Sequence, residues 1–289
     1  MLDQIKLRSL MNISSGSQEV VIGIIDGPID FDHPDFRYSH IRTVNDRQLG
    51  MCKSASSIAC IHGTFVVGML SAKRGTNTLG MCPNCSVILR PIFIEDVDNN
   101  KLHLPSSTPR ELSKAIVETI NAGAKIINLS VGLSTSSLTP YPEIQEAYNY
   151  ASQRGVIIVV AAGNQGNVGY ISILNHPWII PVAACDDYGR LIPISNFGPS
   201  IGNRGLMAPG VNITSTIPEG KYTKMSGTSI SVPFVTGTIA LLWSIFPKAR
   251  AGEIMRSVII GASSHRHNTI VPPLLNAESA LILLKSSIR

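Results

Sequence analysis

Four side chains in this sequence could together perform acyl transfer. The hydroxyl of Ser229 is a poor nucleophile at neutral pH, and it needs a general base to remove its proton. His62 titrates in the right range for that base, and Asp26 could fix its tautomer and stabilise the imidazolium. The Asn164 amide and the Ser229 backbone N–H could stabilise the oxyanion of a tetrahedral intermediate. Each residue alone also has a simpler interpretation, such as a helix N-cap for Ser229 and a structural role for His62.

The elements predicted around these residues would bring them to one edge of a sheet. Buried strands are predicted over residues 19–28, 125–132 and 156–160, and helices over 62–70 and 230–246. Asp26 and Ser130 lie near the ends of two strands, Asn164 follows the third, and His62 and Ser229 begin the helices. Because ligands in open α/β sheets bind at the carboxyl ends of the strands, we expect a site at that edge.

The chain as a whole predicts a single α/β domain spanning residues 1–289. It has 289 residues, of which 44% are hydrophobic and 15% charged, enough for a large buried core. Further strands are predicted over 86–94 and 178–184, and further helices over 110–122 and 142–154. This alternation with short connections predicts a mostly parallel sheet.

Charge and hydropathy argue against two classes of partner. The net charge is +5, but the basic residues are scattered without a Lys/Arg block, so we expect no nucleic-acid partner. No apolar run is long enough for a membrane span, and residues 1–20 do not resemble a signal peptide. We therefore expect no membrane partner and a cytoplasmic location.

The cysteines leave three alternatives open. The five cysteines are too few, and odd in number, for a disulfide scaffold in a chain of this length. Cys52, Cys60, Cys82 and Cys85 could form a zinc site, and Cys52 and Cys60 could form one local disulfide. Buried or idle thiols are the default expectation.

The order Asp, His, Ser and the motifs around these residues resemble those of subtilisin-like serine proteases. The matching segments are Ile24-Ile25-Asp26-Gly27, His62-Gly63-Thr64, Asn128-Leu129-Ser130-Val131-Gly132, Ala161-Ala162-Gly163-Asn164, Ala208-Pro209-Gly210 and Ser226-Gly227-Thr228-Ser229. With Pro233, Gly237 and Leu275-Asn276-Ala277 before an apolar helix, they run in register from about residue 20 to residue 285. The resemblance implies a three-layer subtilisin-like fold, in which helices cover both faces of a mostly parallel central sheet. It also implies a serine endopeptidase that works through an acyl-enzyme.

The resemblance assigns a role to each motif. Asp26, His62 and Ser229 would form the catalytic triad, and Asn164 would donate to the oxyanion. Substrate binding is assigned to two segments: Ser130, Val131 and Gly132 would pair with the substrate backbone, and Ala161, Ala162 and Gly163 would form a wall of the specificity pocket. Residues 98–104 would form the opposite rim of the cleft.

Two departures from secreted relatives bear on metal binding. Those relatives build a structural calcium site in the loop that corresponds to residues 72–79. Here that loop is short and carries Lys73 and Arg74, two cations that would oppose a hard dication. We therefore expect no calcium and no other metal cofactor, although Asp35 matches one ligand position of the family.

The start of the chain narrows the resemblance. Asp26 lies so near Met1 that the sequence leaves no room for the usual pro-segment. With Asp26-Gly27-Pro28 and Pro91-Ile92-Phe93, the chain is similar to the leader-cleaving proteases of cyanobactin pathways. The expected partner is therefore a precursor peptide or protein substrate whose leader is removed.

Two alternative functions remain open from the sequence. Macrocyclases of the same fold transfer a peptide instead of hydrolysing it, and as a family they carry a helical cap inserted between Asp and His. Only 35 residues separate Asp26 from His62 here, which favours hydrolysis. A non-catalytic peptide-binding scaffold is the other alternative. The sequence determines neither the cleavage motif nor the oligomeric state.

Overall fold

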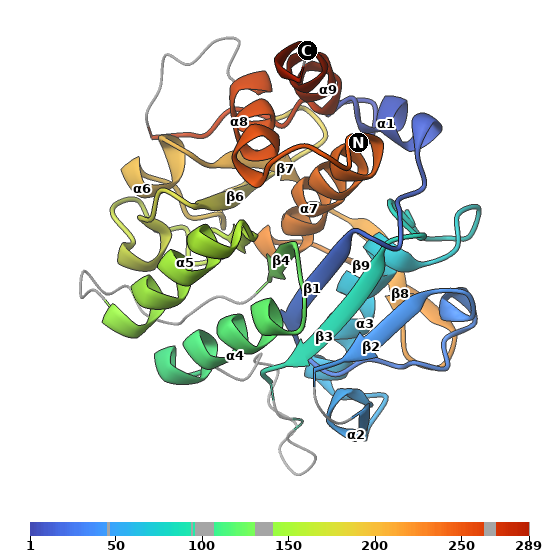
Figure 1. Ribbon diagram of the computed structural model, residues 1–289. Helices are drawn as coiled ribbons and strands as arrows, with labels where there is room; N and C mark the ends of the chain where they lie inside the picture. The colour runs from blue at the N-terminus through green and yellow to red at the C-terminus, as the bar shows by residue number, and fades with distance from the viewer. Residues whose placement is uncertain (45–46, 94, 96–106, 131–140, 263–269, 289) are drawn as a thin grey trace.

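A seven-stranded parallel sheet lies at the centre of the computed structural model (Figure 1). The structure describes residues 1–44, 47–93, 95, 107–130, 141–262 and 270–288. The strand order is β2-β3-β1-β4-β5-β6-β7, and every neighbouring pair is parallel. The strands are β1 (Val21–Asp26), β2 (His40–Thr43), β3 (Ser86–Pro91), β4 (Ile126–Leu129), β5 (Ile157–Ala161), β6 (Ile179–Cys185) and β7 (Leu206–Pro209).

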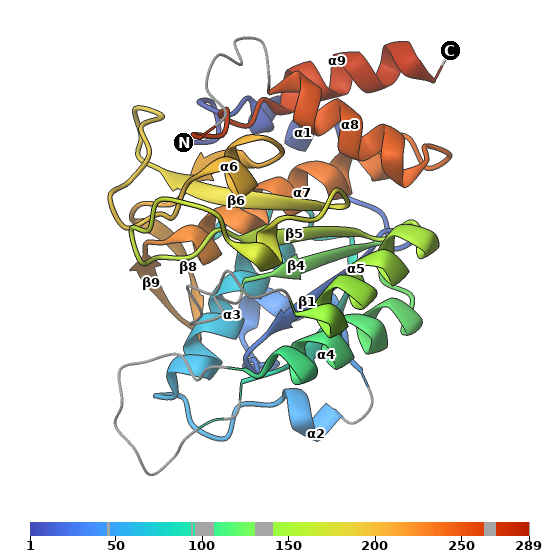
Figure 2. The same cartoon turned by 90° about the vertical axis from the view of Figure 1, so that its left-hand side faces the viewer.

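Helices cover both faces of this sheet, because its strands are apolar on both sides. Ile22 and Ile24 of β1 pack into one core with α3 (Ile58–Ser71) and α7 (Thr228–Ile245). Ile25 packs into the other core with α4 (Pro109–Asn121) and α5 (Pro142–Arg154). Figure 2 shows α4 and α5 on one side of the strands. The predicted three-layer α/β architecture is thus confirmed.

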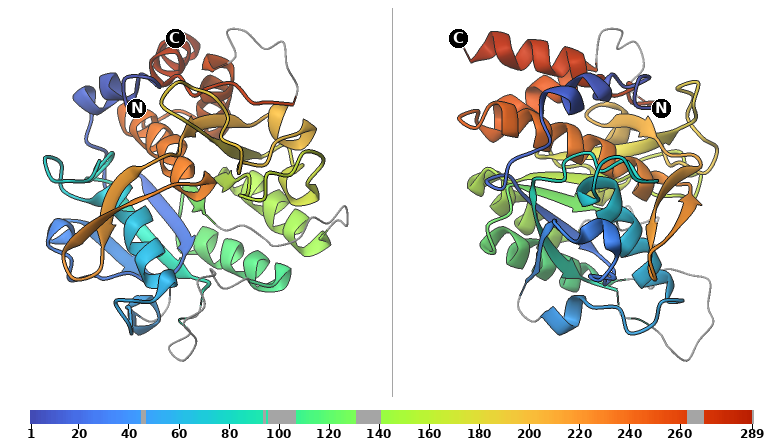
Figure 3. Two further views of the ribbon diagram at one scale, coloured as in Figure 1. Left: turned by 180° about the vertical axis from the view of Figure 1, so that it is seen from behind. Right: turned by 90° about the vertical axis from the view of Figure 1, so that its right-hand side faces the viewer.

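The remaining elements surround these layers. Three helices, α1 (Leu7–Ile13), α8 (Ala251–Gly261) and α9 (Ala277–Ser287), gather at one end of the molecule (Figure 1). The antiparallel strands β8 (Ile213–Ile217) and β9 (Lys221–Met225) form a hairpin beside α3 (Figure 3). Short elements complete the described chain: α2 (Arg47–Gly50), α6 (Pro199–Gly202) and the 3₁₀ turns η1 (Pro34–Phe36) and η2 (Ser172–Leu174).

Helix α7 runs through the interior of the molecule. It is the one helix of the described residues that is long and apolar enough to cross a membrane. It is also 83% buried and packs against β4, β5, β6 and β7. A helix that is apolar all round and enclosed by a sheet and other helices is typical of a protein core, so its composition follows from its position.

Two helix boundaries differ from the sequence-based expectation. Helix α3 begins at Ile58, where Ser57 accepts a hydrogen bond from the Cys60 N–H, so His62 lies in the second turn and not at the start. Helix α7 begins at Thr228, and its N-cap is Gly227. Pro233 is therefore inside the helix, where its missing N–H leaves one carbonyl without a helical partner.

The strand order places one candidate site residue at a point where the connections diverge. Strand β1 lies between β3 and β4, so the chain leaves β1 toward one side of the sheet and later returns on the other. Open α/β sheets bind ligands at such switch points, outside the carboxyl ends of the strands. Asp26 is the last residue of β1, and Ser130 directly follows β4.

Candidate active site

Asp26 and His62 form a buried hydrogen-bonded pair. His62 Nδ1 lies 2.7 Å from Asp26 Oδ1, and that oxygen also accepts a 2.7 Å hydrogen bond from the Gly27 N–H. Asp26 is fully buried, and His62 is 6% exposed. A carboxylate accepts from an N–H, so Nδ1 carries the proton and Nε2 is the basic nitrogen. This is the tautomer that a general base for a hydroxyl requires.

Close backbone packing sets the distance between this pair. A Cβ on Gly27 would come within 2.0 Å of the Ala59 carbonyl oxygen, and one on Gly63 within 2.5 Å of the Pro28 carbonyl oxygen. Only glycine lets the turn after β1 and the first turns of α3 touch in this way. The two glycines in the predicted motifs therefore hold the strand end that carries Asp26 against the helix that carries His62.

The environment raises the pKa of His62. Burial favours the neutral ring and by itself would lower the pKa. The negative charge of Asp26 and its hydrogen bond act in the opposite direction and outweigh burial, so the imidazolium is stabilised. This electrostatic arrangement favours proton uptake by His62 during a reaction.

Ser229 lies at the second position of α7, and its carbonyl is satisfied in an unusual way. In a regular helix this oxygen would accept from the N–H of residue 233, but Pro233 has none. The Ser130 hydroxyl donates to it instead, at 3.1 Å. Ser130 Oγ in turn accepts from Asn128 Nδ2 at 2.8 Å, and Asn128 Oδ1 accepts from the hydroxyl of Thr236 at 2.9 Å.

The structure shows no hydrogen bond between Ser229 and His62. Among the described residues, His62 Nε2 is buried without a hydrogen-bonding partner, and Ser229 is 9% exposed. Catalytic hydrogen bonds are often long or misaligned before substrate binds, so this geometry is compatible with a triad. The structure thus joins Asp26 to His62 directly, and it leaves the His62–Ser229 contact unmade.

Asn164 is linked to the start of α7 by one side-chain hydrogen bond. Its Oδ1 accepts from the Thr228 N–H at 2.8 Å, which leaves the Nδ2 hydrogens to other partners, and the residue is exposed. The Ser229 N–H lies in the first helical turn, where N–H groups have no acceptor within the helix. The two proposed oxyanion donors therefore meet where Asn164 contacts the N-terminus of α7.

The structure describes some of the predicted substrate-binding residues. Ala161 ends β5, and Ala162 and Gly163 follow it; all three are buried, and Gly163 has a φ of +99°. Ser130 is also buried, and its hydroxyl supports α7. Val131, Gly132 and the cleft rim at 98–104 lie outside the described residues.

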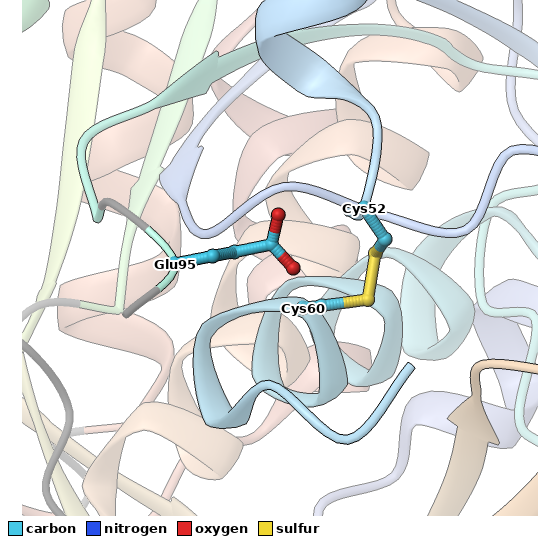
Figure 4. Close-up of side chains that lie close together, drawn as sticks. All are labelled: Cys52, Cys60 and Glu95. Atoms are coloured by element: carbon cyan, nitrogen blue, oxygen red, sulfur yellow. A yellow bond between two sulfur atoms is a disulfide. The ribbon is translucent and has the colours of Figure 1, made fainter. Parts of the chain in front are cut away.

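Cys52 and Cys60 form a disulfide, with their Cα atoms 5.5 Å apart. A zinc site made of four thiolates is thus wrong, because two of its sulfurs are bonded to each other. Cys82 and Cys85 are buried free thiols. Figure 4 shows the Glu95 carboxylate directed toward the disulfide. Its oxygens accept from the N–H groups of Lys53 and Ser54, at 2.6 and 3.1 Å.

The Arg74 guanidinium is hydrogen-bonded to several backbone carbonyl oxygens near the N-terminal helix α1. It donates to the carbonyls of Met11, Ser14, Gly80 and Met81 at 2.6–3.1 Å, and also to Ser15 Oγ at 3.0 Å. Burial lowers the pKa of Arg74 but leaves it far above neutrality. A cation is therefore already bound to these carbonyls by the chain itself.

Asp35, the residue that matches a calcium-ligand position of the family, has another partner. Its Oδ2 accepts a 2.9 Å hydrogen bond from the hydroxyl of Tyr222 on β9, and Lys73 N–H donates to its backbone carbonyl. Burial, together with this carboxylate, raises the pKa of Tyr222. The carboxylate of Asp35 thus joins η1 to the β8–β9 hairpin.

Several residues around the site were not predicted from the sequence. The motifs identified Asp26, His62, Asn164 and Ser229, but they carry no sign of the roles of Thr236, which bonds to Asn128 from α7 itself, or of Asn196, which bonds to the Asn164 loop. Thr236 lies one helical turn beyond Pro233, and Asn196 lies in the chain after β6. Their function depends on contacts across the fold, which no local pattern reports.

The sheet, the Asp–His pair and the serine at the start of a buried helix together define a subtilisin-like serine peptidase. The Subtilase family profile matches residues 17–274. A thermophilic serine proteinase of Bacillus sp. (strain AK1) is 33% identical over 237 residues, which cover 81% of this chain and 54% of that protein. The chain thus belongs to the subtilase family of serine-type peptidases, and it spans about half the length of this relative.

Two solved structures show the same architecture over nearly the whole chain. The prenylagaramide maturation protease PagA superimposes with a TM-score of 0.81 at 25% identity, covering 96% of this chain and 98% of that one. The PatG macrocyclase in complex with peptide has a TM-score of 0.83 at 21% identity, covering 98% and 97%. At that identity the likeness to PatG shows the fold alone.

Proposed function

We propose that this chain is an endopeptidase that cleaves the leader from a ribosomally made precursor peptide. The observation that carries the peptidase part is the buried 2.7 Å contact between Asp26 and His62, next to a basic Nε2 without a partner among the described residues. The similarity to a maturation protease, PagA, along 98% of its chain supports the leader-cleaving part.

The proposed reaction has two halves, acylation and deacylation, and the same catalytic groups act in both. Ser229 Oγ attacks the peptide carbonyl while His62 Nε2 takes its proton, and the oxyanion binds Asn164 Nδ2 and the Ser229 N–H. His62 then gives the proton to the leaving amine, and an acyl-enzyme remains. Water then attacks the acyl carbonyl while His62 takes its proton, and His62 returns that proton to Ser229 Oγ as the bond between Oγ and the acyl carbon breaks and the carboxylic acid leaves.

A fluorophosphonate probe tests the nucleophile. We expect labelling of the wild-type chain and none of Ser229→Ala. Ser244→Ala is the matched control, because this serine lies near the other end of the same helix, where its hydroxyl donates to the Ala240 carbonyl and lies 3.9 Å from Cys85 Sγ. Labelling that survives in Ser229→Ala would overturn the assignment and favour a non-catalytic scaffold.

The absence of a helical cap supports hydrolysis over peptidyl transfer. Between β1 and α3, the described residues form only η1, β2 and the four-residue α2. Nothing in these residues covers the acyl-enzyme against water. Mass spectrometry of precursor digests decides the matter: hydrolysis adds one water across the cut bond, whereas a macrocyclic product is lighter than its linear counterpart by one water.

We also propose a cytoplasmic location, and the Cys52–Cys60 disulfide is an argument against it. Disulfides are rare in reducing compartments, although exceptions exist. Rapid alkylation of thiols in intact cells, followed by mass mapping of Cys52 and Cys60, tests this part. Free thiols at both positions are expected for a cytoplasmic protein, and a fully oxidised pair would contradict it.

A further inference from the structure

Asn196 is a buried side chain whose hydrogen-bonding groups are all used by the loop that carries Asn164. It is 3% exposed. Its Nδ2 donates to the Ala162 carbonyl at 3.0 Å and to Gln165 Oε1 at 2.8 Å. Its Oδ1 accepts from the N–H groups of Gln165 and Asn167, at 3.1 and 2.9 Å. An asparagine amide offers two donor hydrogens and two acceptor positions, so this side chain is fully satisfied.

These contacts hold the loop on both sides of Asn164. Ala162 precedes that residue, and Gln165 and Asn167 follow it. The backbone N–H of Asn196 also donates to the Gly163 carbonyl at 2.9 Å. A Cβ on Gly163 would lie 2.4 Å from Asn196 Nδ2, so the loop backbone rests directly on this amide.

The side chain of Asn164 is itself weakly held. Among the residues that the structure describes, it makes one hydrogen bond, from the Thr228 N–H to Oδ1, and it is exposed. The direction of its Nδ2 therefore depends on the backbone of residues 162–167. An oxyanion donor lowers the barrier only if it is in place before charge develops, because it then needs no reorganisation during the reaction. A small displacement of the loop would remove that advantage.

We propose that Asn196 is a positioning residue for the oxyanion hole. It holds residues 162–167 in the one backbone arrangement that directs the Asn164 amide toward the developing oxyanion. Asn196 makes no hydrogen bond to Asp26, His62 or Ser229 among the described residues, so it reaches the oxyanion through Asn164. Because Ala162 and Gly163 also belong to the predicted wall of the specificity pocket, an effect through that wall would appear in KM, whereas the effect through Asn164 appears in kcat. This inference rests on the proposed role of Asn164 as an oxyanion donor.

A double-mutant cycle on kcat tests the proposal. Asn164→Ala is expected to lower kcat by about 10²- to 10³-fold, and Asn196→Ala by roughly 10- to 100-fold, because a misdirected donor is lost only in part. KM should change far less. The double variant should be no slower than Asn164→Ala alone, because residues that act through one group are not additive.

The alternatives give different results in this cycle. If Asn196→Ala still costs its full factor in the Asn164→Ala background, or leaves kcat unchanged in the wild-type background, the proposal is overturned. If Asn164→Ala itself leaves kcat unchanged, the oxyanion assignment fails first and the proposal fails with it. The two failures are therefore distinguishable.

Two further variants separate positioning from general loosening. Asn196→Asp keeps the acceptors for Gln165 and Asn167 but turns a buried carboxylate oxygen toward the Ala162 carbonyl and Gln165 Oε1, so we expect a kcat no higher than that of Asn196→Ala. Ser195→Ala removes a neighbouring buried hydroxyl that accepts from the Ala184 N–H, donates to the Asn196 backbone carbonyl at 3.3 Å and makes no hydrogen bond to residues 162–167. It should lower the melting temperature without lowering kcat. A loss of kcat in Ser195→Ala equal to that in Asn196→Ala would overturn the proposal.

Discussion

Among single residues, the Asp26–His62 pair shows how burial and charge oppose each other. Burial favours the neutral ring of His62, and the Asp26 carboxylate favours the protonated one; the pKa is raised because the carboxylate dominates. The same hydrogen bond selects the tautomer with a basic Nε2. One buried carboxylate thus determines both the orientation of the base and the pH at which it works.

The raised pKa predicts the pH dependence of catalysis. The general base must be neutral, so kcat/KM should fall as pH falls through a pKa above the ordinary imidazole value of about 6.5. Asp26→Asn removes the charge and leaves burial, so the midpoint should move below that value and kcat should fall about 10⁴-fold. Initial rates between pH 5 and pH 9 measure both effects. A wild-type midpoint below about 6.5 would contradict this account.

Ser130, which follows β4, shows how one hydroxyl compensates for a proline in the distant helix α7. Ser130→Ala would leave the Ser229 carbonyl and the Asn128 amide without their partner, at a cost of about 1–3 kcal/mol in the free energy of unfolding. Because Ser229 is the proposed nucleophile and its backbone would lose this hydrogen bond, kcat should also fall. Urea denaturation and steady-state kinetics check the two effects.

The matched control for this prediction is a hydroxyl away from the site. Ser113 Oγ donates to the Glu143 carbonyl at 2.8 Å, between α4 and α5. Ser113→Ala removes the same type of bond and should leave kcat unchanged. Equal losses of kcat in Ser113→Ala and Ser130→Ala would show that Ser130 has no special relation to the nucleophile.

Among the elements, α3 is held by two independent devices. The glycines of the 27–28 turn and of α3 set its distance from β1, and the Cys52–Cys60 disulfide ties its first turn to the preceding loop. The Glu95 carboxylate fixes that loop through two N–H groups. Only the first device touches Asp26 and His62 directly, so the two should affect activity differently.

Loss of the disulfide should therefore lower stability more than activity. Replacing Cys52 and Cys60 together with alanine removes a short closed loop, and the free energy of unfolding should fall by about 2 kcal/mol. We expect kcat/KM to change by less than about 3-fold, which corresponds to only a small change in the activation free energy. Denaturation with and without dithiothreitol checks the stability change. The reductant should lower the midpoint of the wild type and leave that of the double variant unaltered.

Across the whole molecule, the N-terminal segment is joined to the rest of the fold by a charged side chain. Arg74 binds the carbonyls of residues 11, 14, 80 and 81, which come from α1, the chain after it and the loop after α3. Hydrogen bonds from a charged donor are stronger than neutral ones. Arg74 thus links segments that lie far apart in the sequence.

This arrangement predicts stability without calcium. A chelator or added Ca²⁺ should leave the melting temperature of the wild type unchanged. Arg74→Ala should lower the free energy of unfolding by at least about 2 kcal/mol, because several buried carbonyls lose a charged donor. Lys73→Ala, which removes the neighbouring exposed cation, should have little effect. A large drop in melting temperature on chelation would show that a bound dication, and not Arg74, holds this end of the molecule.

Local sequence patterns were sufficient for the elements that are apolar and regular. The helix over 142–154 was predicted to the residue, the strand around Ala161 to within one residue, and the strand around Asp26 to within two at each end. The two strands could be found because burial on both faces requires continuous apolar runs. The start of α3 was missed by four residues, because Ile58, Ala59, Cys60 and Ile61 form a single apolar turn after a polar stretch, too short to show helical periodicity. The start of α7 was missed by two residues, because Thr228 and Ser229 precede the apolar run.

By itself the sequence determined the chemical groups, their order along the chain and the apolar runs that make the sheet. Those properties are local, and they were enough to predict the fold and to propose the four residues of the site. Only the tertiary structure decided that Cys52 pairs with Cys60, that Ser130 supports α7, that Arg74 binds several backbone carbonyls and that Asn196 underlies the Asn164 loop. Each of these depends on polar groups brought together from distant segments. A buried polar group must find a partner wherever the fold supplies one, and the sequence does not say where that will be.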